Sequence, residues 1–482
     1  MPPDRSLLSS VPADAFFEIE NQLYEPRFQG VPIGATLVDF FVRNFQDAAL
    51  SLSYAAALRA TLGRWRFNYL GRRCHWPAPR LEKGRLLVTW HDDTPRFNDL
   101  VLPVLAELGA GQCNVIARAP SVGGRLPRDT GLCTPEQVYT GDRSVWRREY
   151  LRCRRHWCHS VKKWLKAEHL PGHLLPHLEY ALARRSWEIF NFFHFLDELQ
   201  PTAVLTETEH NTPWSCLVLV ARLMGIPTLT MMHGAIYPPY GYTPLLCDVA
   251  LCWGEQQREQ MVGLGTEPER LRVTGCQRLV RCPRADCGEV RARLGLPAEG
   301  PLIMLATGPI PKERRRRLVF PFAEAFKDTA LATGVVRLHA SEKLEDYREE
   351  MAEFPSIRFL ENAPWSVDEA MAACDVVVIN NSGLGNDALV MGRLVILMDV
   401  LDEPLSNGQV LADKAGCPIV RSASELRQAV DRILTDRVYR ARLKNQAEAY
   451  GAWFCAAFGQ EAARNVVVEV RRHVGGSGVL SR

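Results

Sequence analysis

Short apolar runs alternate with amphipathic stretches along most of this chain. The run at 376–379, Val-Val-Val-Ile, is apolar and β-branched at every position, as is typical of a strand buried on both faces of a parallel sheet. Small polar residues follow it, then a helical pattern that ends at Gly392, and then another apolar run at 395–397. This order predicts a strand, a turn, a helix and a second strand.

The same strand–helix pattern occurs in two blocks of the sequence. The first block starts with a strand at Leu86, and its further predicted strands are 113–118, 203–209, 227–234, 248–254 and 271–275. The second block has predicted strands at 302–308, 335–341, 357–360, 376–379, 395–397 and 419–422. Strands that alternate with helices favour parallel sheets covered on both faces. We therefore predict an α/β fold of two tandem, doubly wound, Rossmann-like domains, with a ligand site in the cleft between them.

Breaks in this pattern give the predicted domain boundaries. Residues 277–300 are polar, basic and interrupted by proline and glycine, which is typical of a linker. We predict an N-terminal helical extension of unassigned role at 1–80, a first Rossmann-like domain at 81–276, the linker at 277–300, a second Rossmann-like domain at 301–435, and a C-terminal helical tail at 436–482. A chain of 482 residues has room for about two to three domains.

Composition narrows the class of protein. A net charge of +3 gives no argument for nucleic acid as a partner, and none is predicted. Several of the 14 cysteines lie inside apolar runs, as in reduced intracellular proteins that use cysteine as a small hydrophobic residue. The first residues lack the pattern of a secretory signal, and no apolar run approaches the ~20 residues that span a bilayer. We therefore expect a cytoplasmic protein.

One predicted helix, at 143–166, combines aromatic and basic residues. Its apolar positions recur every three or four residues and form one face, made of Trp146, Tyr150, Cys153, Trp157, Val161 and Trp164. Arginines and lysines cover the rest. Two interpretations are open: a surface helix packed on the core, or an interfacial helix that brings the protein to the anionic inner face of a membrane. The cysteines and histidines at 153–159 do not have the spacing of a zinc site, so no metal is predicted.

Polar residues gather where the strands of the second block end. Ligands of open α/β sheets bind past the carboxyl ends of the strands. The candidate nucleotide-binding residues there are Thr307, Gly308, His339, Ser341, Asn381, Ser382, Gly383 and Asp387. Ser382 can cap the helix that follows, and Gly383 and Gly385 are expected to leave the first N–H groups of that helix uncovered for a phosphate. An ordinary strand–helix turn is the alternative interpretation.

A run of cations follows Gly308, ahead of a helix predicted at 318–333. Lys312 and Arg314–Arg317 place five cations within six residues, which can clamp a phosphate or form a solvated charge run. The chain has no GxxxxGK[ST] loop, which excludes a P-loop NTPase. It also has no GxGxxG after a strand, which argues against an NAD enzyme.

The strand ends of the first block carry ionisable residues. The candidate catalytic residues are Asp92 after the first strand, Glu209 and His210 after the third, and His233 at the end of the fourth. A histidine that precedes a glycine at a strand end is a candidate general base at neutral pH, and Glu209 or Asp92 can orient it. A structural histidine bonded to a loop carbonyl is the alternative.

Two stretches resemble a known family. The run from Gly225 to Gly275, GIPTLTMMHGAIYPPYG…CDVALCWGEQQREQMVGLGTEPERLRVTG, resembles the middle of GT-B glycosyltransferases. The similar groups are capsule and surface polysaccharide transferases, the glycerophosphotransferases of teichoic acid synthesis, and the UDP-N-acetylglucosamine 2-epimerases that share the fold. The run CDVVVINNSGLGNDALVMGRLVIL resembles the nucleotide-binding end of the same group. Together the resemblance covers about residues 200–435.

The resemblance implies a GT-B fold, with His233 as the base and a nucleotide held by His339, Ser382, Gly383 and Asp387. Two departures leave the nucleotide base open. His339-Ala340 and Asn381-Ser382 stand where CMP-sugar transferases often have His-Pro and Ser-Ser. Asp387 stands where a longer glutamate is common.

The predicted function is therefore metal-independent glycosyl transfer. A nucleotide-sugar donor, which is a substrate and not a cofactor, would give its sugar to a hydroxyl of a surface glycan or glycolipid, with His233 as base and cations at the leaving phosphate. One alternative is a UDP-sugar 2-epimerase that uses Asp92, Glu207 and Glu209. Another is a non-catalytic partner in polysaccharide assembly. The sugar, the acceptor, the anomeric outcome and the oligomeric state stay open.

Overall fold

The structure is a computed structural model that describes residues 27–37, 60–61, 81–167, 174–236, 241–279, 287–308, 312–327, 332–339, 341–361, 366–401 and 405–475. The chain divides into two compact units. Unit 1 comprises Met1–Cys252, Gln257–Gln277 and Gln460–Arg482, and unit 2 comprises Trp253–Gln256 and Arg278–Gly459. Most of the predicted extension at 1–80 lies outside the described residues.

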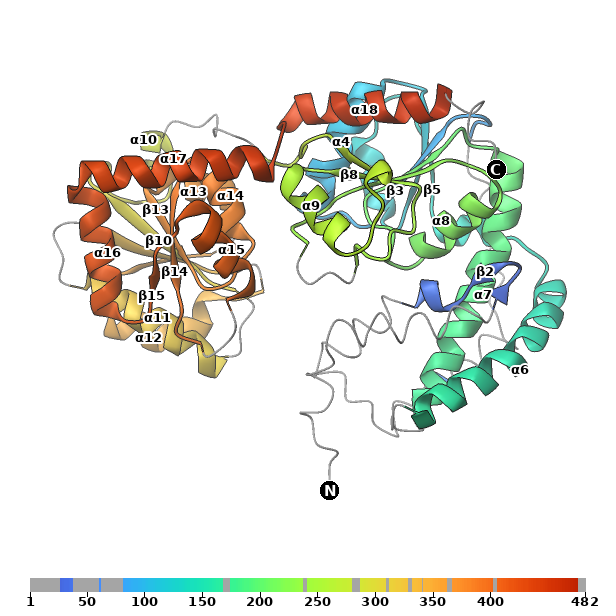
Figure 1. The fold of residues 1–482 in the computed structure, drawn as a ribbon, viewed down its shortest axis with the longest axis horizontal. Helices are drawn as coiled ribbons and strands as arrows, with labels where there is room; N and C mark the ends of the chain where they lie inside the picture. The colour runs from blue at the N-terminus through green and yellow to red at the C-terminus, as the bar shows by residue number, and fades with distance from the viewer. Residues whose placement is uncertain are drawn as a thin grey trace. The chain divides into compact units, whose positions relative to one another are not determined.

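Unit 1 is built on a seven-stranded parallel sheet in the order β5-β4-β3-β6-β7-β8-β9 (Figure 1). The central strands are buried along their whole length, as expected for apolar runs that lie between two helical layers. The strands are β3 (Leu86–Trp90), β4 (Cys113–Ala117), β5 (Gly131–Cys133), β6 (Val204–Thr206), β7 (Thr228–Met231), β8 (Val249–Cys252) and β9 (Leu271–Val273). Shorter helices beside the sheet include α4 (Pro95–Leu108), α5 (Pro135–Val138), α8 (Trp214–Leu223) and α9 (Glu255–Gly263).

The last helix, α18 (Gly459–Gly475), packs on the sheet of unit 1. Its buried residues Ala463, Val466, Val467 and Val470 belong to the same apolar core as strands β3 and β4 and helix α4. Figure 1 shows α18 lying along the same side of this sheet as α4. The core of unit 1 is therefore closed by residues from the far end of the chain.

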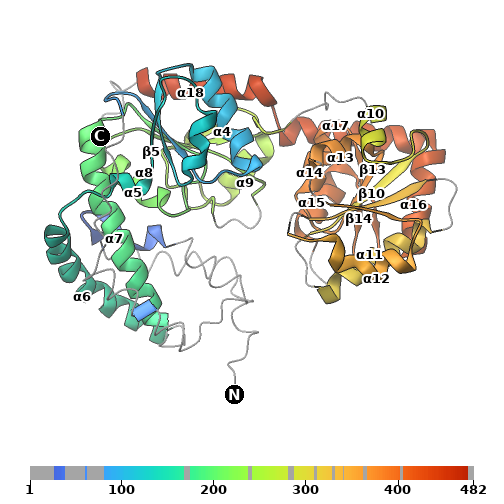
Figure 2. The same cartoon turned by 180° about the vertical axis from the view of Figure 1, so that it is seen from behind.

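Two long helices, α6 (Arg143–Ala167) and α7 (Leu174–Leu199), run side by side in both views of the chain (Figures 1 and 2). The aromatic face of α6 is turned into this helix pair. Trp146 stacks on Tyr150 at 5.1 Å between ring centroids and meets Trp187 of α7 edge-on at 5.4 Å. A short hairpin, β1 (Arg27–Phe28) and β2 (Val31–Pro32), packs against α6 and α8.

Unit 2 contains a six-stranded parallel sheet in the order β12-β11-β10-β13-β14-β15. Its strands are β10 (Leu302–Ala306), β11 (Thr333–Arg337), β12 (Arg358–Leu360), β13 (Val376–Ile379), β14 (Leu394–Met398) and β15 (Ile419–Val420). Its helices are α10 (Cys287–Arg293), α11 (Lys312–Phe326), α12 (Arg348–Glu353), α13 (Val367–Ala373), α14 (Leu384–Val390), α15 (Ser406–Ala415), α16 (Ala423–Thr435) and α17 (Arg437–Phe454).

Each sheet reverses its strand order once. In unit 1 the reversal lies between β3 and β6, which pair in parallel with Leu87 opposite Val204. In unit 2 it lies between β10 and β13, with Met304 opposite Val377. Such topological switch points are where doubly wound sheets bind ligands, past the carboxyl ends of the strands. The two switch points therefore locate the candidate site residues.

The predicted strands are all present in the structure, and β1, β2 and β5 are additional strands in segments without a strand prediction. The helix predicted at 318–333 is wrong in its bounds, because α11 begins at Lys312 and ends at Phe326. Its first turns consist of charged residues, which form helix readily but carry no apolar periodicity. Within the part of the chain that the structure describes, no helix is long and apolar enough to cross a membrane.

Candidate functional site

Glu207 lies at the switch point of unit 1, directly after β6. Its side chain is fully buried, and Thr89 of β3 donates a short hydrogen bond to its Oε2 atom. Its Oε1 atom has no hydrogen-bond partner among the described residues. Burial raises the pKa of this carboxyl group to about 7, because the charged form loses its hydration. Glu207 can therefore both hold and release a proton near neutral pH.

His233 follows β7, the strand next to β6. Its ring stacks on Tyr242 with centroids 4.9 Å apart and lies 6.2 Å from the ring of Phe97. Burial lowers the pKa of His233 to about 3, with further contributions from the Arg96 cation and from His91 and His210. The imidazole is therefore neutral at physiological pH.

The glycine after His233 leaves room for two neighbouring side chains. A Cβ atom at Gly234 would lie 2.6 Å from Nη2 of Arg96 and 2.9 Å from the hydroxyl of Tyr242. Arg96 also donates from Nε to the backbone oxygen of His233 at 3.0 Å. Because Gly234 has no side chain, the Arg96 guanidinium and the Tyr242 hydroxyl can approach the backbone beside the His233 ring.

The predicted carboxylate Asp92 serves as a turn acceptor at the start of α4. Its Oδ1 atom accepts from the backbone N–H of Thr94 at 3.1 Å and from the Thr94 hydroxyl at 2.6 Å. Its neighbour Asp93 accepts from Ser121 and pairs with Arg125. These contacts fix the loop after β3 and give Asp92 a structural role there.

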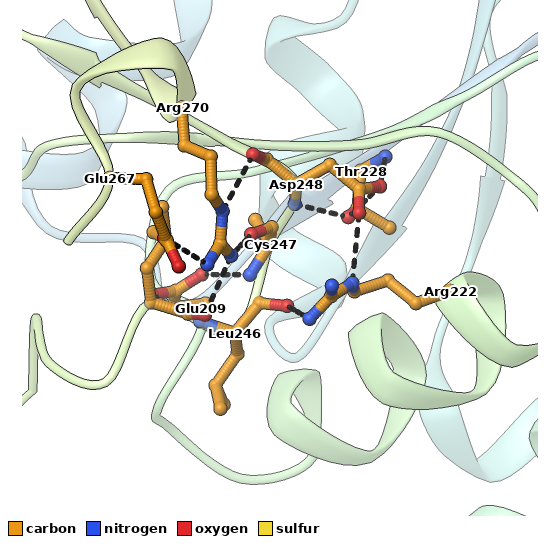
Figure 3. Close-up of polar contacts among 9 residues, drawn as sticks. Glu209, Arg222, Thr228, Leu246, Cys247, Asp248, Glu267 and Arg270 are labelled. Carbon is orange, nitrogen blue, oxygen red and sulfur yellow. Dashed lines mark hydrogen bonds and ion pairs between the residues drawn. The ribbon is translucent and has the colours of Figure 1, made fainter. Parts of the chain in front are cut away.

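Glu209 clamps the segment that precedes β8 (Figure 3). Its carboxylate accepts from the backbone N–H groups of Leu246 at 3.1 Å and Cys247 at 2.6 Å. Arg270 binds the carbonyl side of the same segment by donating to the backbone oxygens of Leu245, Cys247 and Asp248. Glu209 is buried, and its carboxylate is used by these backbone bonds.

His210 is buried next to this clamp, with Nε2 3.4 Å from Oε1 of Glu209. Its ring nitrogens make no hydrogen bond within the described part of the chain. Of the four predicted catalytic residues, Asp92 and Glu209 bind backbone groups, whereas the His233 ring stacks on Tyr242 and the His210 ring nitrogens have no hydrogen-bond partner among the described residues.

In unit 2, Thr307 and His339 end the neighbouring strands β10 and β11. The Thr307 hydroxyl donates to the buried carboxylate of Glu342 and accepts from the backbone N–H of His339 at 2.9 Å. The backbone N–H of Ser341 donates to Nδ1 of His339 at 3.2 Å, which leaves Nε2 to carry the ring proton. His339 can therefore offer an N–H group to an anion.

The turn between β13 and α14 binds its own polar groups. Asn381 accepts from the backbone N–H of Gly408 at 3.1 Å, and Ser382 accepts from that of Leu384 at 3.2 Å. Ser382 thus binds the first N–H group of α14, whereas the N-cap residue of this helix is Gly383, which makes no side-chain cap bond. The N–H of Gly385, expected to be uncovered, instead donates to the Ser382 carbonyl at 3.3 Å.

The two glycines of this turn have different roles. A Cβ atom at Gly385 would lie 2.6 Å from Cδ1 of Ile379 and 2.6 Å from Cδ1 of Leu411, so this glycine permits close packing. A Cβ atom at Gly383 would meet no atom within 4 Å. Gly383 is exposed and is the position in the turn where a ligand can approach the backbone.

Asp387 forms an ion pair inside unit 2. Both of its oxygens bind Arg278, at 3.1 and 3.4 Å, and its side chain is buried. Arg278 in turn lies over the ring of Trp253, 5.2 Å from the centroid. Asp387, a candidate nucleotide-binding residue, thus holds the chain where Arg278 enters unit 2.

The cation run lies on the first turns of α11. Arg314 donates to the backbone oxygen of Leu401 at 2.8 Å, beyond the end of β14. Arg315 pairs with Glu342 and Asp346, and Arg316 pairs with Glu349 and Glu353. The backbone of Lys312 starts the helix, while its side chain lies outside the described residues. Arg314 and Arg315 therefore both contact residues near the strand ends, Arg315 through the Glu342 carboxylate that accepts from Thr307.

The described residues contain no group of three or more His, Cys, Asp or Glu side chains that could hold a metal ion. Around α6, the thiol of Cys158 donates to Glu179 and that of Cys153 to the backbone oxygen of Arg27.

No protein-family model and no curated protein matches the sequence. Solved structures nevertheless align with most of the chain. A crystal structure of UDP-N-acetylglucosamine 2-epimerase aligns at 12% identity with a TM-score of 0.51, covering 83% of this chain and 99% of the other. The fold is GT-B. A crystal structure of a glycosyltransferase from Rickettsia africae aligns at 11% identity with a TM-score of 0.50, covering 82% and 99%. At these identities the GT-B likeness shows the fold and leaves the reaction open.

The ionisable groups near the strand ends of unit 1 include residues beyond the predicted site. The sequence names Glu207 as a carboxylate of the epimerase alternative and gives no catalytic role to Arg96, Arg118 or Tyr242. Arg118, directly after β4, has Nη1 3.1 Å from Nε2 of His91. The position of Arg118 after a strand was a usable signal, whereas Tyr242 comes from a loop whose path the sequence does not reveal.

Proposed function

We propose that this chain is a GT-B enzyme that acts on a nucleotide-activated sugar. The observation that carries the proposal is the pair of groups after the adjacent strands β6 and β7 in unit 1. These are a buried carboxyl group with a pKa of about 7 and an imidazole that stays neutral at physiological pH. Groups whose surroundings shift their pKa values away from the ordinary ones are typical of acid–base catalysis.

The preferred reaction is transfer of the sugar to a hydroxyl of a surface glycan or glycolipid. In this proposal His233 accepts the hydroxyl proton. Its basicity would increase when an anionic substrate approaches Arg96, because that cation is one cause of its low pKa. The donor nucleotide is assigned to unit 2, where the N–H of His339 and the open backbone at Gly383 support binding of a phosphate. Arg314 supplies positive charge near the strand ends, and no metal ion is assigned to the step.

The test begins with donor identification. Thermal shift with UDP-, GDP-, CMP- and CDP-sugars finds the nucleotide, because a ligand that binds the folded state raises the melting temperature. Nucleotide release is then compared between the wild type, His233→Ala and His233→Asn, with the exposed His194→Ala of α7 as a matched control. We expect both His233 variants to lose roughly 100-fold or more in turnover while they still bind donor. Unchanged turnover would remove His233 from the mechanism.

Epimerisation of a UDP-sugar is the second candidate, because Glu207 favours it. A carboxyl group with a pKa of about 7 can both remove and return a proton at a sugar carbon. The name of the aligned UDP-N-acetylglucosamine 2-epimerase makes that nucleotide-sugar the first substrate to test. Deuterium from solvent would enter C2 of the sugar without any acceptor, and Glu207→Gln would abolish the incorporation. Nucleotide release without deuterium incorporation would reject this candidate, and donor binding without either reaction would indicate a non-catalytic binding protein.

A further inference from the structure

One face of α6 is covered by exposed cations. Six arginines and lysines lie there, and all six are exposed: Arg148, Arg152, Arg155, Lys162, Lys163 and Lys166. At ~100° per residue these positions fall within a sector of roughly 100°, and at 1.5 Å per residue they extend over about 27 Å. We call this surface the basic face of α6.

The opposite face of α6 is part of the protein core. Trp146, Tyr150, Trp157 and Val161 are at most 1% exposed. The indole N–H of Trp146 donates to the Ser186 hydroxyl of α7 at 3.1 Å. These side chains are therefore not available to enter a lipid layer, and the Trp164 side chain lies outside the described residues. The same packing holds the helix rigid with its cations outward.

Among the described residues, no ion pair compensates the charge of the basic face. The described carboxylates form no ion pair with any of its six cations, whereas Arg154, beside the face, pairs with Glu179 of α7 at 2.8 Å. On the remaining surface of α6, Glu149 accepts from Gln29 of the hairpin turn. Six positive charges in one straight row give a strong local field on a chain whose net charge is only +3.

We propose that the basic face of α6 binds the surface of an anionic lipid bilayer, with the helix lying parallel to it. Clusters of four to eight Lys and Arg residues on a helix typically bind anionic lipid headgroups. Leu151, which is 44% exposed and adjoins this row, can contact the headgroup region. A single-stranded nucleic acid is disfavoured, because its binding needs exposed aromatic rings for base stacking, and the aromatic rings named above point into the core.

The test is co-sedimentation of the full chain with vesicles. Phosphatidylcholine vesicles are compared with vesicles that contain roughly 30% phosphatidylglycerol, at about 0.1 M and about 1 M salt. We expect the wild type to sediment only with the anionic vesicles and only at low salt. The variant Arg148→Glu/Arg152→Glu/Arg155→Glu should partition about 100-fold or more weakly, because three surface cations are lost and replaced by repelling charges.

A matched control reverses three exposed cations elsewhere in unit 1. The variant Arg128→Glu/Arg464→Glu/Arg471→Glu changes the net charge equally and should sediment like the wild type, and circular dichroism melting checks that both variants fold. Equal loss of sedimentation with the anionic vesicles in both variants would show that binding depends only on net charge, and it would overturn the proposal. So would an absence of sedimentation by the wild type, or tighter wild-type binding to a single-stranded RNA of matched charge than to the anionic vesicles.

Discussion

The buried carboxyl group of Glu207 should make the stability of unit 1 depend on pH in a definite direction. Its pKa changes from 4.5 to about 7 on folding, so the folded protein holds the proton more tightly than the unfolded chain. The contribution of this group is fully present below pH 4.5 and is lost as the pH rises through 7. Between about pH 5 and pH 8 the loss amounts to roughly 2.5 kcal/mol.

Glu207→Gln removes the titration and keeps the shape of the protonated side chain, including an oxygen that can accept from Thr89. The variant should therefore gain stability relative to the wild type as the pH rises, by about 2.5 kcal/mol from about pH 5 to pH 8. Hydrogen exchange of peptides that cover β3 and β6 reports the opening of this sheet. The intrinsic pH dependence of exchange cancels when variant and wild type are compared at equal pH.

Glu198→Gln, an exposed position on α7, serves as the control and should differ from the wild type by the same amount at every pH. If the stability difference between Glu207→Gln and the wild type did not change with pH, the carboxyl group would already be ionised at the acidic end of the range. This result would refute the reasoning. A variant that loses stability with rising pH would refute it as well, because the charged form would then be the stabilised one.

Three further substitutions test the contacts that hold the candidate site. Arg270→Met should destabilise unit 1 by about 2–3 kcal/mol in urea unfolding, because three backbone carbonyls lose a charged donor. Gly385→Ala should cost about 1–3 kcal/mol in thermal unfolding of unit 2, since the new methyl group would meet two buried methyl groups at 2.6 Å. Asp387→Asn should lower the stability of unit 2 by about 1–3 kcal/mol and leave the Arg278 charge without its carboxylate, and proteolysis next to Arg278 should become faster; an unchanged digestion pattern would contradict this role.

The strands could be predicted from sequence because parallel strands are buried on both faces. The continuous apolar runs at 302–306 and 376–379 are too short for a typical helix and too apolar for a surface loop, and both are strands. The start of α11 was missed for the opposite reason. Its first six residues are all charged, and the apolar periodicity that identifies a helix begins only at Leu318.

The positions of the candidate site residues could be predicted, but not their bonding. Strand ends mark where a ligand meets an α/β sheet, and Glu209 and Asp387 both follow such ends. What these carboxylates bind depends on Leu246 and Arg278, which lie 37 and 109 residues away along the chain. No local pattern encodes such a partner. The raised pKa of Glu207 likewise follows from burial by distant elements, since its own sequence neighbours are polar.

The placement of α18 has a practical consequence for dissecting this protein. A fragment that stops at the end of β9 would contain all seven strands of the first sheet. It would still lack the valines near residue 467 that cover one side of the sheet, so an apolar surface would be exposed to water. Expression of unit 1 as a folded fragment should therefore require a circularly permuted gene, in which the segment of α18 is joined ahead of the first strand of the sheet.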